Sequence, residues 1–378
     1  MGMPASQESV SSVRSAGPFS VRVSDAANDP EWDAFLEEVS IGHHAQTSAW
    51  GRARAFIGWR PIRVLVSEDG RIVAGVQMVT RPMPAAGNVG FVCRGPVVAE
   101  DRQDLTRLAL DEMMAMGETR GVQYLVVQPP RGSDWMRVEL GRIGFRYGAF
   151  DIDITATVRI DLQPDLAELR AGMSKKCREH VRLAERRGVT VRRGSESDLA
   201  IFNRLKDVQS ARLGYARRED GYYNELWHAL APRGHIGLFI AEYEGEPVAA
   251  QLVIPFGDTC HHMERPWSGE HGKLKPNELL KWEVIKWAKS EGYRFADLEG
   301  IEPPVAEAIL SGEGIPDDPR YSASRFKLKF GGQVILDPPS FDYVYNPVLR
   351  FAYRCIPNRV MRAAWMRRLL FTFRETGS

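Results

Sequence analysis

Two stretches of the chain repeat the same order of apolar and polar positions. Residues 64–76 and 239–251 lie 175 positions apart, and each consists of an apolar run, an acidic residue followed by glycine, and a second apolar run. This order is typical of a β-hairpin, because glycine supplies the positive φ that a tight turn requires. The pattern predicts one hairpin at Gly70 and a matching one at Gly245.

The sequence around the two hairpins repeats as well. A helical pattern precedes each hairpin, and a second helical pattern that ends near glycine follows it, before a short apolar strand. In chain order these segments are 30–39, 105–120 and 124–127 in the first half and 197–209, 279–290 and 295–298 in the second. A repeat of this length indicates a duplicated domain rather than the unit of a solenoid.

Helices, an antiparallel hairpin, then a helix and a strand form the order of GNAT-like (acyl-CoA N-acyltransferase-like) domains. We therefore expect an α+β fold of two tandem GNAT-like domains without a long coiled-coil insertion. The first domain should span residues 20–155 and be rejoined by 335–378, and the second should span 156–334. Residues 1–19, rich in Ser, Ala and Gly, should form a disordered lead-in. The turn that holds the pyrophosphate of acyl-CoA in many such domains is missing from both halves of the sequence.

A third pattern lies near the end of the second half. Residues 325–330 alternate cationic and apolar side chains and are followed by two glycines. A strand with this alternation places Lys327 on a cationic face and anchors Phe326 in the core. A lysine held in this way in a cleft can stabilise a developing oxyanion or bind a phosphate. The same pattern also fits an edge strand whose lysines face water, and the alternation alone leaves both interpretations open.

Composition narrows the class of protein. The 378 residues carry a formal net charge of +1 and 44% of them are hydrophobic, as in ordinary globular proteins. The four cysteines form no CxxC pair, and the histidine pairs 43–44 and 261–262 lack the i, i+4 spacing of helical metal ligands. We therefore expect a reducing compartment and no metal site. No apolar run approaches the roughly 18 residues of a membrane span, so the sequence predicts a cytoplasmic protein.

Cations cluster in two places despite the low net charge. A helical pattern at 170–187 is dense in Lys and Arg, which favours an anionic partner such as RNA phosphates over a merely solvated helix face. The stretch 350–374 mixes seven arginines with aromatic and aliphatic residues. It fits a peripheral contact with an anionic membrane, a second RNA-facing surface, or a helix packed on the first domain.

Several short motifs follow one another in an order found in a known family. They are residues 44–50, 94–97, 174–178, 184–189, 218–223, 297–300 and 326–332. Each is weak alone, but their order and spacing together resemble the Fem (FemABX) family of aminoacyl-tRNA-dependent peptidyltransferases. The resemblance covers nearly all of the chain after about residue 25. It implies an enzyme that adds amino acids to peptidoglycan precursors, with aminoacyl-tRNA as co-substrate, no cofactor and no DNA partner.

The resemblance also implies roles for single residues. The lysine of the family's Phe-Lys-x-x-Phe-Gly-Gly motif falls on Lys327, which is expected to stabilise the oxyanion with Phe326 beside it. Asp297 is either the base that deprotonates the acceptor amine or the partner of a cation, and the same holds for Glu299. Residues expected to bind the acceptor are Trp50, Arg54, Arg94, Arg218 and Tyr222, and those expected to bind tRNA are Lys175, Lys176, Arg178, Arg182 and Arg186.

The sequence departs from the family pattern at Arg54, which keeps the charge but stands where the family has lysine, and at two further positions. Phe91 stands where tyrosine is common, and His262 lies in a segment where the family more often has a tyrosine-bearing strand. These departures leave open a tRNA-dependent tailoring enzyme that forms an amide on a natural product or small amine. A non-catalytic RNA-binding protein on the same fold is a further alternative, against which Lys327 and the two glycines speak.

Overall fold

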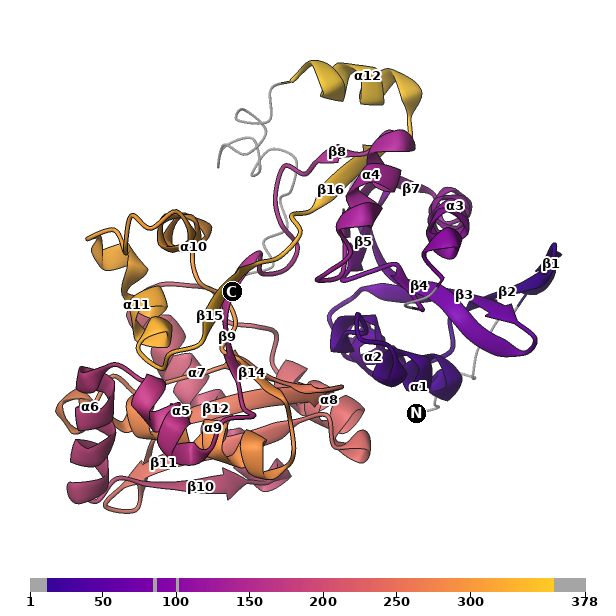
Figure 1. The fold of residues 1–378 in the computed structure, drawn as a ribbon. Coiled ribbons are helices and arrows are strands. Elements are labelled where there is room, and N and C mark those ends of the chain that lie inside the picture. Colours follow the sequence, from indigo (N-terminus) through magenta and orange to yellow (C-terminus); the bar gives the residue numbers. More distant parts are fainter. Residues whose placement is uncertain (1–11, 84–86, 100–101, 357–378) are drawn as a thin grey trace. The chain divides into compact units, whose positions relative to one another are not determined.

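The computed structural model describes residues 12–83, 87–99 and 102–356. The chain divides into two compact units. Unit 1 comprises the described residues up to Asp153 together with those from Pro338 onward, and unit 2 extends from Ile154 to Asp337. Figure 1 shows both units as sheets covered by helices.

Unit 1 contains a mixed sheet in the order β1-β2-β3-β4-β5-β7-β16-β8, with β6 paired to β4. Its strands are β1 (Ser12–Ala16), β2 (Phe19–Ser24), β3 (Arg60–Glu68), β4 (Arg71–Met83), β5 (Gly87–Cys93), β6 (Val97–Val98), β7 (Val122–Gln128), β8 (Arg146–Tyr147) and β16 (Phe341–Val344). Its helices are α1 (Pro30–Glu38), α2 (Ser48–Phe56), α3 (Thr106–Thr119), α4 (Asp134–Arg142) and α12 (Pro347–Cys355).

Unit 2 contains a second mixed sheet in the order β10-β11-β12-β13-β14-β9-β15. Its strands are β9 (Ala156–Asp161), β10 (Thr190–Gly194), β11 (Gly237–Tyr243), β12 (Glu246–Phe256), β13 (Thr259–Glu264), β14 (Phe295–Asp297) and β15 (Gln333–Leu336). Its helices are α5 (Leu166–Gly172), α6 (Lys175–Arg186), α7 (Leu199–Leu213), α8 (Tyr222–Leu230), α9 (Pro276–Ser290), α10 (Pro303–Leu310) and α11 (Ser322–Leu328).

The predicted hairpins are confirmed and match in detail. β3 and β4 are joined at Asp69 (φ 49°) and Gly70 (φ 78°), and β11 and β12 at Glu244 (φ 53°) and Gly245 (φ 81°). Two central residues with positive φ define the type I′ turn, whose twist suits the flanking strands. Each hairpin also has a register shift two residues before its turn. The duplication therefore extends to the backbone conformation of single residues.

Each unit also contains the expected helix and strand after its hairpin. α3 leads into β7, which pairs in parallel with β5, and α9 leads into β14, which pairs in parallel with β13. All other pairs in the two sheets are antiparallel. The two units thus have the α+β architecture of two tandem GNAT-like domains.

The first and last described segments, which begin at residue 12 and end at residue 356, belong to unit 1. Strand β16 pairs with β7 and β8, so the chain returns to the first sheet after unit 2. Strand β1 pairs with β2 across a turn at Gly17. The prediction of disorder was therefore wrong for residues 12–19. Their polar composition resembles that of a disordered segment, yet they form a hairpin that adds an edge strand to the sheet. Residues 1–11 lie outside the described part.

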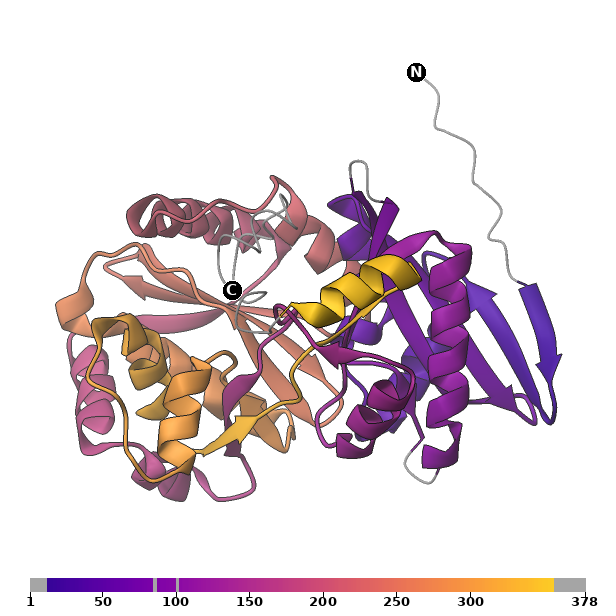
Figure 2. The ribbon, with the colours of Figure 1, turned by 90° about the horizontal axis from the view of Figure 1, so that it is seen from above.

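The core of unit 2 lies between its sheet and the helices on one face. Alternate residues of β11 point to opposite faces, and Phe239 and Ala241 pack in this core with Val181 of α6 and Ile285 of α9. Figure 2 shows α6 and α7 on opposite sides of this sheet. Helices therefore cover both faces of the unit 2 sheet.

Gly332 closes the turn that joins α11 to β15. Its φ is +90°, and a Cβ there would lie 2.7 Å from the carbonyl oxygen of Arg159 on β9. Both the left-handed backbone and the close approach require glycine. Together they fix the register of β15 on β9, which begins with Gln333 opposite Arg159.

We expect Gly332→Ala to lower the free energy of unfolding by about 3 kcal/mol, since it adds a clash to the cost of a positive φ. Gly312→Ala is the matched control, because Gly312 has φ +80° but open space around its Cβ position; it should cost about 1 kcal/mol. Urea denaturation of both variants measures the difference. Equal losses would show that the close approach to Arg159 contributes nothing.

Candidate active site

Lys327 lies on helix α11, where the sequence pattern predicted a strand. The side chain of Asp318 accepts a hydrogen bond from the amide of Arg320 at 2.9 Å and begins the turn that leads into α11. Phe326 and Phe330 are four positions apart, so a helical turn places them on the same side, with ring centroids 5.3 Å apart. The strand prediction was wrong because a short alternation containing Phe at i and i+4 fits a helix equally well.

The Lys327 ammonium binds the loop that follows β14. Its Nζ donates hydrogen bonds to the carbonyl oxygens of Glu299 and Gly300, each at 2.5 Å. A lysine ammonium has three N–H donors, so these bonds hold the group in place and leave a third donor. A cation with a fixed position and a remaining donor is what oxyanion stabilisation requires.

The surroundings of Lys327 lower the pKa of its ammonium group. Burial lowers the pKa of Lys327 to about 8. Within this net shift the Glu299 carboxylate opposes burial, the Arg265 guanidinium acts in the same direction as burial, and Asp297 and Glu302 add to the effect of Glu299. The charge of Lys327 is therefore sensitive to pH just above neutrality.

Asp297 binds the backbone of the loop that follows β14 from its buried side. Its side chain is fully buried, and Oδ1 accepts hydrogen bonds from Thr157 Oγ1 at 2.5 Å and from the amide of Glu299 at 2.9 Å. These contacts make Asp297 a backbone-capping residue. The structure thus places Asp297 beside the Lys327 loop, with its carboxylate directed to the protein interior.

Phe326 and Arg265 form the wall next to Lys327. The Arg265 guanidinium lies 4.2 Å from the centroid of the Phe326 ring, a distance at which cation–π attraction operates. Burial lowers the pKa of Arg265 to about 10. Phe326 therefore has a packing role that keeps a second cation close to the site.

A buried polar chain lies behind this wall. Lys281 on α9 is 2% exposed, and its Nζ lies 2.9 Å from Gln251 Oε1 and 3.0 Å from His262 Nδ1. Burial, with Arg265 and Lys327 adding to it, lowers the pKa of Lys281 well below its ordinary value. His262, at which the sequence departs from the family pattern, is thus the partner of a buried lysine.

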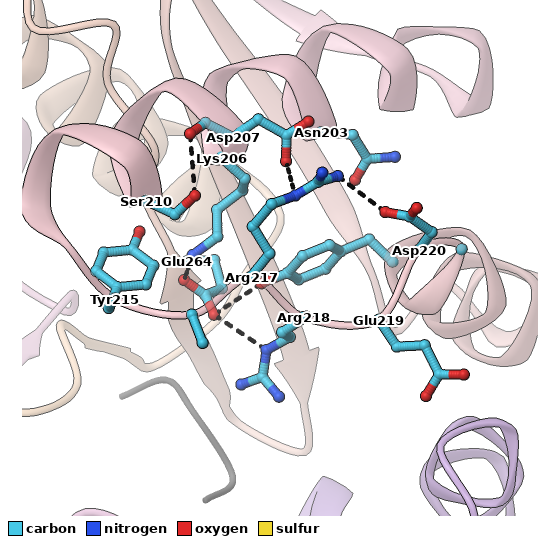
Figure 3. A pocket seen from close by; sticks show the side chains of 13 residues that line it. Asn203, Lys206, Asp207, Ser210, Tyr215, Arg217, Arg218, Glu219, Asp220 and Glu264 are labelled. Carbon is cyan, nitrogen blue, oxygen red and sulfur yellow. Dashed lines mark hydrogen bonds and ion pairs between the residues drawn. The ribbon is translucent and has the colours of Figure 1, made fainter.

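A pocket of about 200 Å³ opens beside α7 and the start of α8 (Figure 3). The Glu264 carboxylate lies in its wall and interacts with Lys206 Nζ at 2.9 Å, Tyr223 Oη at 3.0 Å and Arg218 Nε at 3.7 Å. Burial lowers the pKa of Arg218, but the neighbouring phenols and this carboxylate raise it above its ordinary value. Arg218 is therefore a permanent cation at the pocket wall.

The pocket separates the two tyrosines of α8. Tyr223 lines it, whereas Tyr222 is 1% exposed and lies 4.9 Å beneath the Arg218 guanidinium, measured to the ring centroid. Tyr222 thus supports Arg218 from the core. Sequence reasoning missed Tyr223, Lys206 and Glu264, whose mutual contacts span 41 and 58 positions and leave no local signal.

The remaining predicted acceptor residues lie in unit 1. Trp50 and Arg54 are half-buried on α2, and the Arg54 guanidinium lies 5.5 Å from the Trp59 ring. Arg94 is buried, has φ 56°, and its Nε donates to Asp153 at 2.6 Å. The structure therefore gives Arg94 a buried ion pair, while Arg54 remains partly accessible.

Helix α6 carries the predicted tRNA-binding cations. Its buried side, formed by Cys177, Val181 and Ala184, packs in the core of unit 2. Lys175, Lys176, Arg182 and Arg186 are exposed. Arg178 is half-buried and donates to the carbonyl oxygens of Ala171 and Met173 at the end of α5. Four of the five cations thus face solvent, and the fifth joins two helices.

The C-terminal basic stretch is described only as far as residue 356. Helix α12, which overlaps the start of this stretch, exposes Val348, Leu349 and Phe351, while Arg354 donates to the carbonyl oxygen of Gly144. The arginines at 359, 362, 367, 368 and 374 lie outside the described residues. Among the described residues, no helix combines the length and apolarity needed to cross a bilayer.

Comparison with known proteins identifies the family. The model of the FemAB family matches residues 27–243, which is more than half of the chain. The chain belongs to the FemAB family. It is 25% identical over 301 residues to a lipid II:glycine glycyltransferase of Staphylococcus aureus (strain MRSA252), covering 75% of this chain and 70% of that protein.

Solved structures agree with the fold of this FemAB-family protein. FemX superposes with a TM-score of 0.74 at 19% identity, over 85% of this chain and 97% of the FemX chain. L-PGS from Bacillus licheniformis gives a TM-score of 0.53 at 17% identity, over 89% and 97%. A tandem GNAT protein from the clavulanic acid biosynthesis pathway gives 0.50 at 13% identity, over 85% and 97%. At these identities the likeness concerns the fold, and it confirms two tandem GNAT-like domains.

We expect Glu264→Gln to lower the free energy of unfolding by about 1–3 kcal/mol, because it leaves three donors around the pocket without a charged acceptor. Asp220→Asn is the control: Asp220 pairs with Arg217 at 2.8 Å, but its side chain is 87% exposed, so the change should cost below about 0.5 kcal/mol. Chemical denaturation measures both. A loss no larger for Glu264→Gln than for the control would contradict the central role of Glu264.

Proposed function

We propose that this FemAB-family protein transfers an amino acid from an aminoacyl-tRNA to an amine of a peptidoglycan precursor stem peptide. Support for a transferase comes from the family and from relatives named lipid II:glycine glycyltransferase. The observation that carries the proposal is the Lys327 ammonium, which is held by two carbonyl oxygens and keeps a third N–H donor.

Lys327 supplies the positive charge that balances the negative charge of the transition state. When the amine attacks the ester carbonyl, negative charge accumulates on the carbonyl oxygen. A donor that is already in place needs no reorganisation at that moment, and one such donor is typically worth about 3–4 kcal/mol in the transition state. In this proposal the third N–H of Lys327 binds the oxyanion.

The donor and the acceptor use different cations. The exposed cations of α6 form a sequence-independent surface for the phosphates of a tRNA. Arg218 at the pocket wall of unit 2 suits an anionic group of the acceptor, because a guanidinium binds phosphate or carboxylate in a bidentate manner. Arg54 in unit 1, considered by itself, is partly accessible and has the same chemistry. The exposed apolar residues of α12 and the arginines beyond it suit a peripheral contact with an anionic membrane, where a lipid-linked acceptor is located.

Purified protein mixed with a UDP-linked muramyl pentapeptide and radiolabelled Gly-, Ala- or Ser-tRNA pools should transfer label from one pool into the peptide. A Lys175→Glu/Lys176→Glu variant should raise the KM for the donor about tenfold or more and leave the KM for the acceptor unchanged. Arg60→Glu/Arg71→Glu, which reverses the charge at two exposed positions in unit 1, is the charge-matched control. Label that reaches other amines but not the muramyl peptide would contradict the proposed acceptor.

We expect Lys327→Ala to lower kcat about 100- to 1000-fold, because it removes the oxyanion donor. The wild-type rate should fall as the pH rises through about 8, where the ammonium loses its proton. Lys327→Arg keeps its charge at higher pH and should lose this basic limb. Initial rates between pH 6 and about 9.5, corrected for spontaneous ester hydrolysis, test both points; normal turnover by Lys327→Ala would rule out the role of Lys327.

A further inference from the structure

Glu299 has a backbone conformation that an L residue adopts at a cost. Its φ is 52°, in the left-handed region, which is uncommon for residues other than glycine, asparagine and aspartate. Lys327 binds its carbonyl oxygen and Asp297 binds its amide. Such a conformation persists only where the surroundings impose it, and positions of this kind concentrate at functional sites.

The Glu299 side chain points to a histidine on the neighbouring strand. Its Oε1 lies 3.5 Å from His261 Nδ1 on β13, and the two side chains are 20% and 10% exposed. β13 and β14 are paired in parallel with His261 opposite Asp297, so the sheet fixes the spacing of the pair. The carboxylate is thus partly accessible and oriented, unlike that of Asp297, which is fully buried beneath the loop.

We propose that Glu299, oriented by His261, is the base that takes a proton from the attacking amine, next to the ammonium of Lys327. The inference rests on the proposed function and assigns the proton transfer within it. Glu299 contacts the reacting amine and is a catalytic residue, whereas His261 acts through Glu299 and is a positioning residue.

The proposed step balances atoms and charge. The acceptor arrives as an ammonium, and one of its three protons passes to the Glu299 carboxylate and from there to water. The freed electron pair of nitrogen forms the C–N bond at the ester carbonyl, whose electron pair moves to the oxyanion at Lys327. As the C–O bond to the ribose breaks, the departing oxygen receives the second proton, and the amide nitrogen keeps the third.

The charges around the site favour this proton transfer. An ammonium that enters the loop region loses hydration and meets like charges, which favours its neutral form; the same factors lower the pKa of Lys327. Glu299 itself has titratable or charged neighbours on four elements of unit 2. They are His261 on β13, Asp297 on β14, Lys281 on α9 and Lys327 on α11.

The test compares an amine acceptor with hydroxylamine, which is already neutral near pH 7 and needs no base. Glu299→Gln should lower kcat with the amine about 100-fold or more and lower the rate with hydroxylamine less than about threefold. Glu299→Asn, which tolerates the left-handed backbone, should behave in the same way and guards against loss of folding. Glu307→Gln removes an exposed carboxylate on α10 and is the matched control for charge.

Three results would overturn the inference. Equal losses with both nucleophiles would show that Glu299 only supports the loop, and a normal rate with the amine would show that the carboxylate is dispensable. His261→Gln should lower kcat about tenfold without a change in the KM for the amine; an altered KM alone would contradict its positioning role. Wild-type protein inactive with every donor and nucleophile would instead refute the proposed function, and with it the premise of this inference.

Discussion

The candidate site depends on the two hydrogen bonds that join Lys327 to the carbonyl oxygens of Glu299 and Gly300. They connect helix α11 to the loop after β14, two segments that share no backbone pairing. Because these bonds involve a charged donor, they are stronger than bonds between neutral groups. The left-handed backbone of Glu299, its carboxylate and the Phe326–Arg265 pair all lie around this connection.

The parts of the fold that the sequence predicts are those encoded locally. The hairpin turns at Gly70 and Gly245 carry their own conformational requirement, and the helix and strand after each hairpin have clear periodicity. α11 was missed because its alternation is too short to separate a strand from a helix, although Phe326 and Phe330 at i and i+4 are compatible with the helix that forms. Where a short pattern fits the period of a strand and that of a helix equally well, tertiary contacts decide which of the two forms.

The sequence predicts the orientation of the site residues even less well than it predicts the fold. Lys327 could be singled out from its motif, but the contacts that orient it come from a loop 27 and 28 positions earlier. Tyr222 and Tyr223 are adjacent in sequence and both are buried, and only the start of α8 after Gly221 decides which of them lines the pocket. Asp297 and Glu299 are similarly equivalent on paper, yet one is enclosed beneath the loop and the other reaches His261. Sequence reasoning thus identifies the residue types of the site, and the fold assigns their orientation.

Lys327 has enough N–H groups for two separate roles: two of them bind the loop after β14, and the third is the donor proposed for the oxyanion. A neutral lysine amine retains two N–H donors, enough for the carbonyl oxygens of Glu299 and Gly300, and loses only the third. The loop can therefore keep its shape when the ammonium is deprotonated, while the donor that we propose for the oxyanion disappears. Under this proposal, titration of one side chain switches catalysis without changing the architecture: the alkaline form is folded but inactive, and a return to lower pH restores activity without refolding.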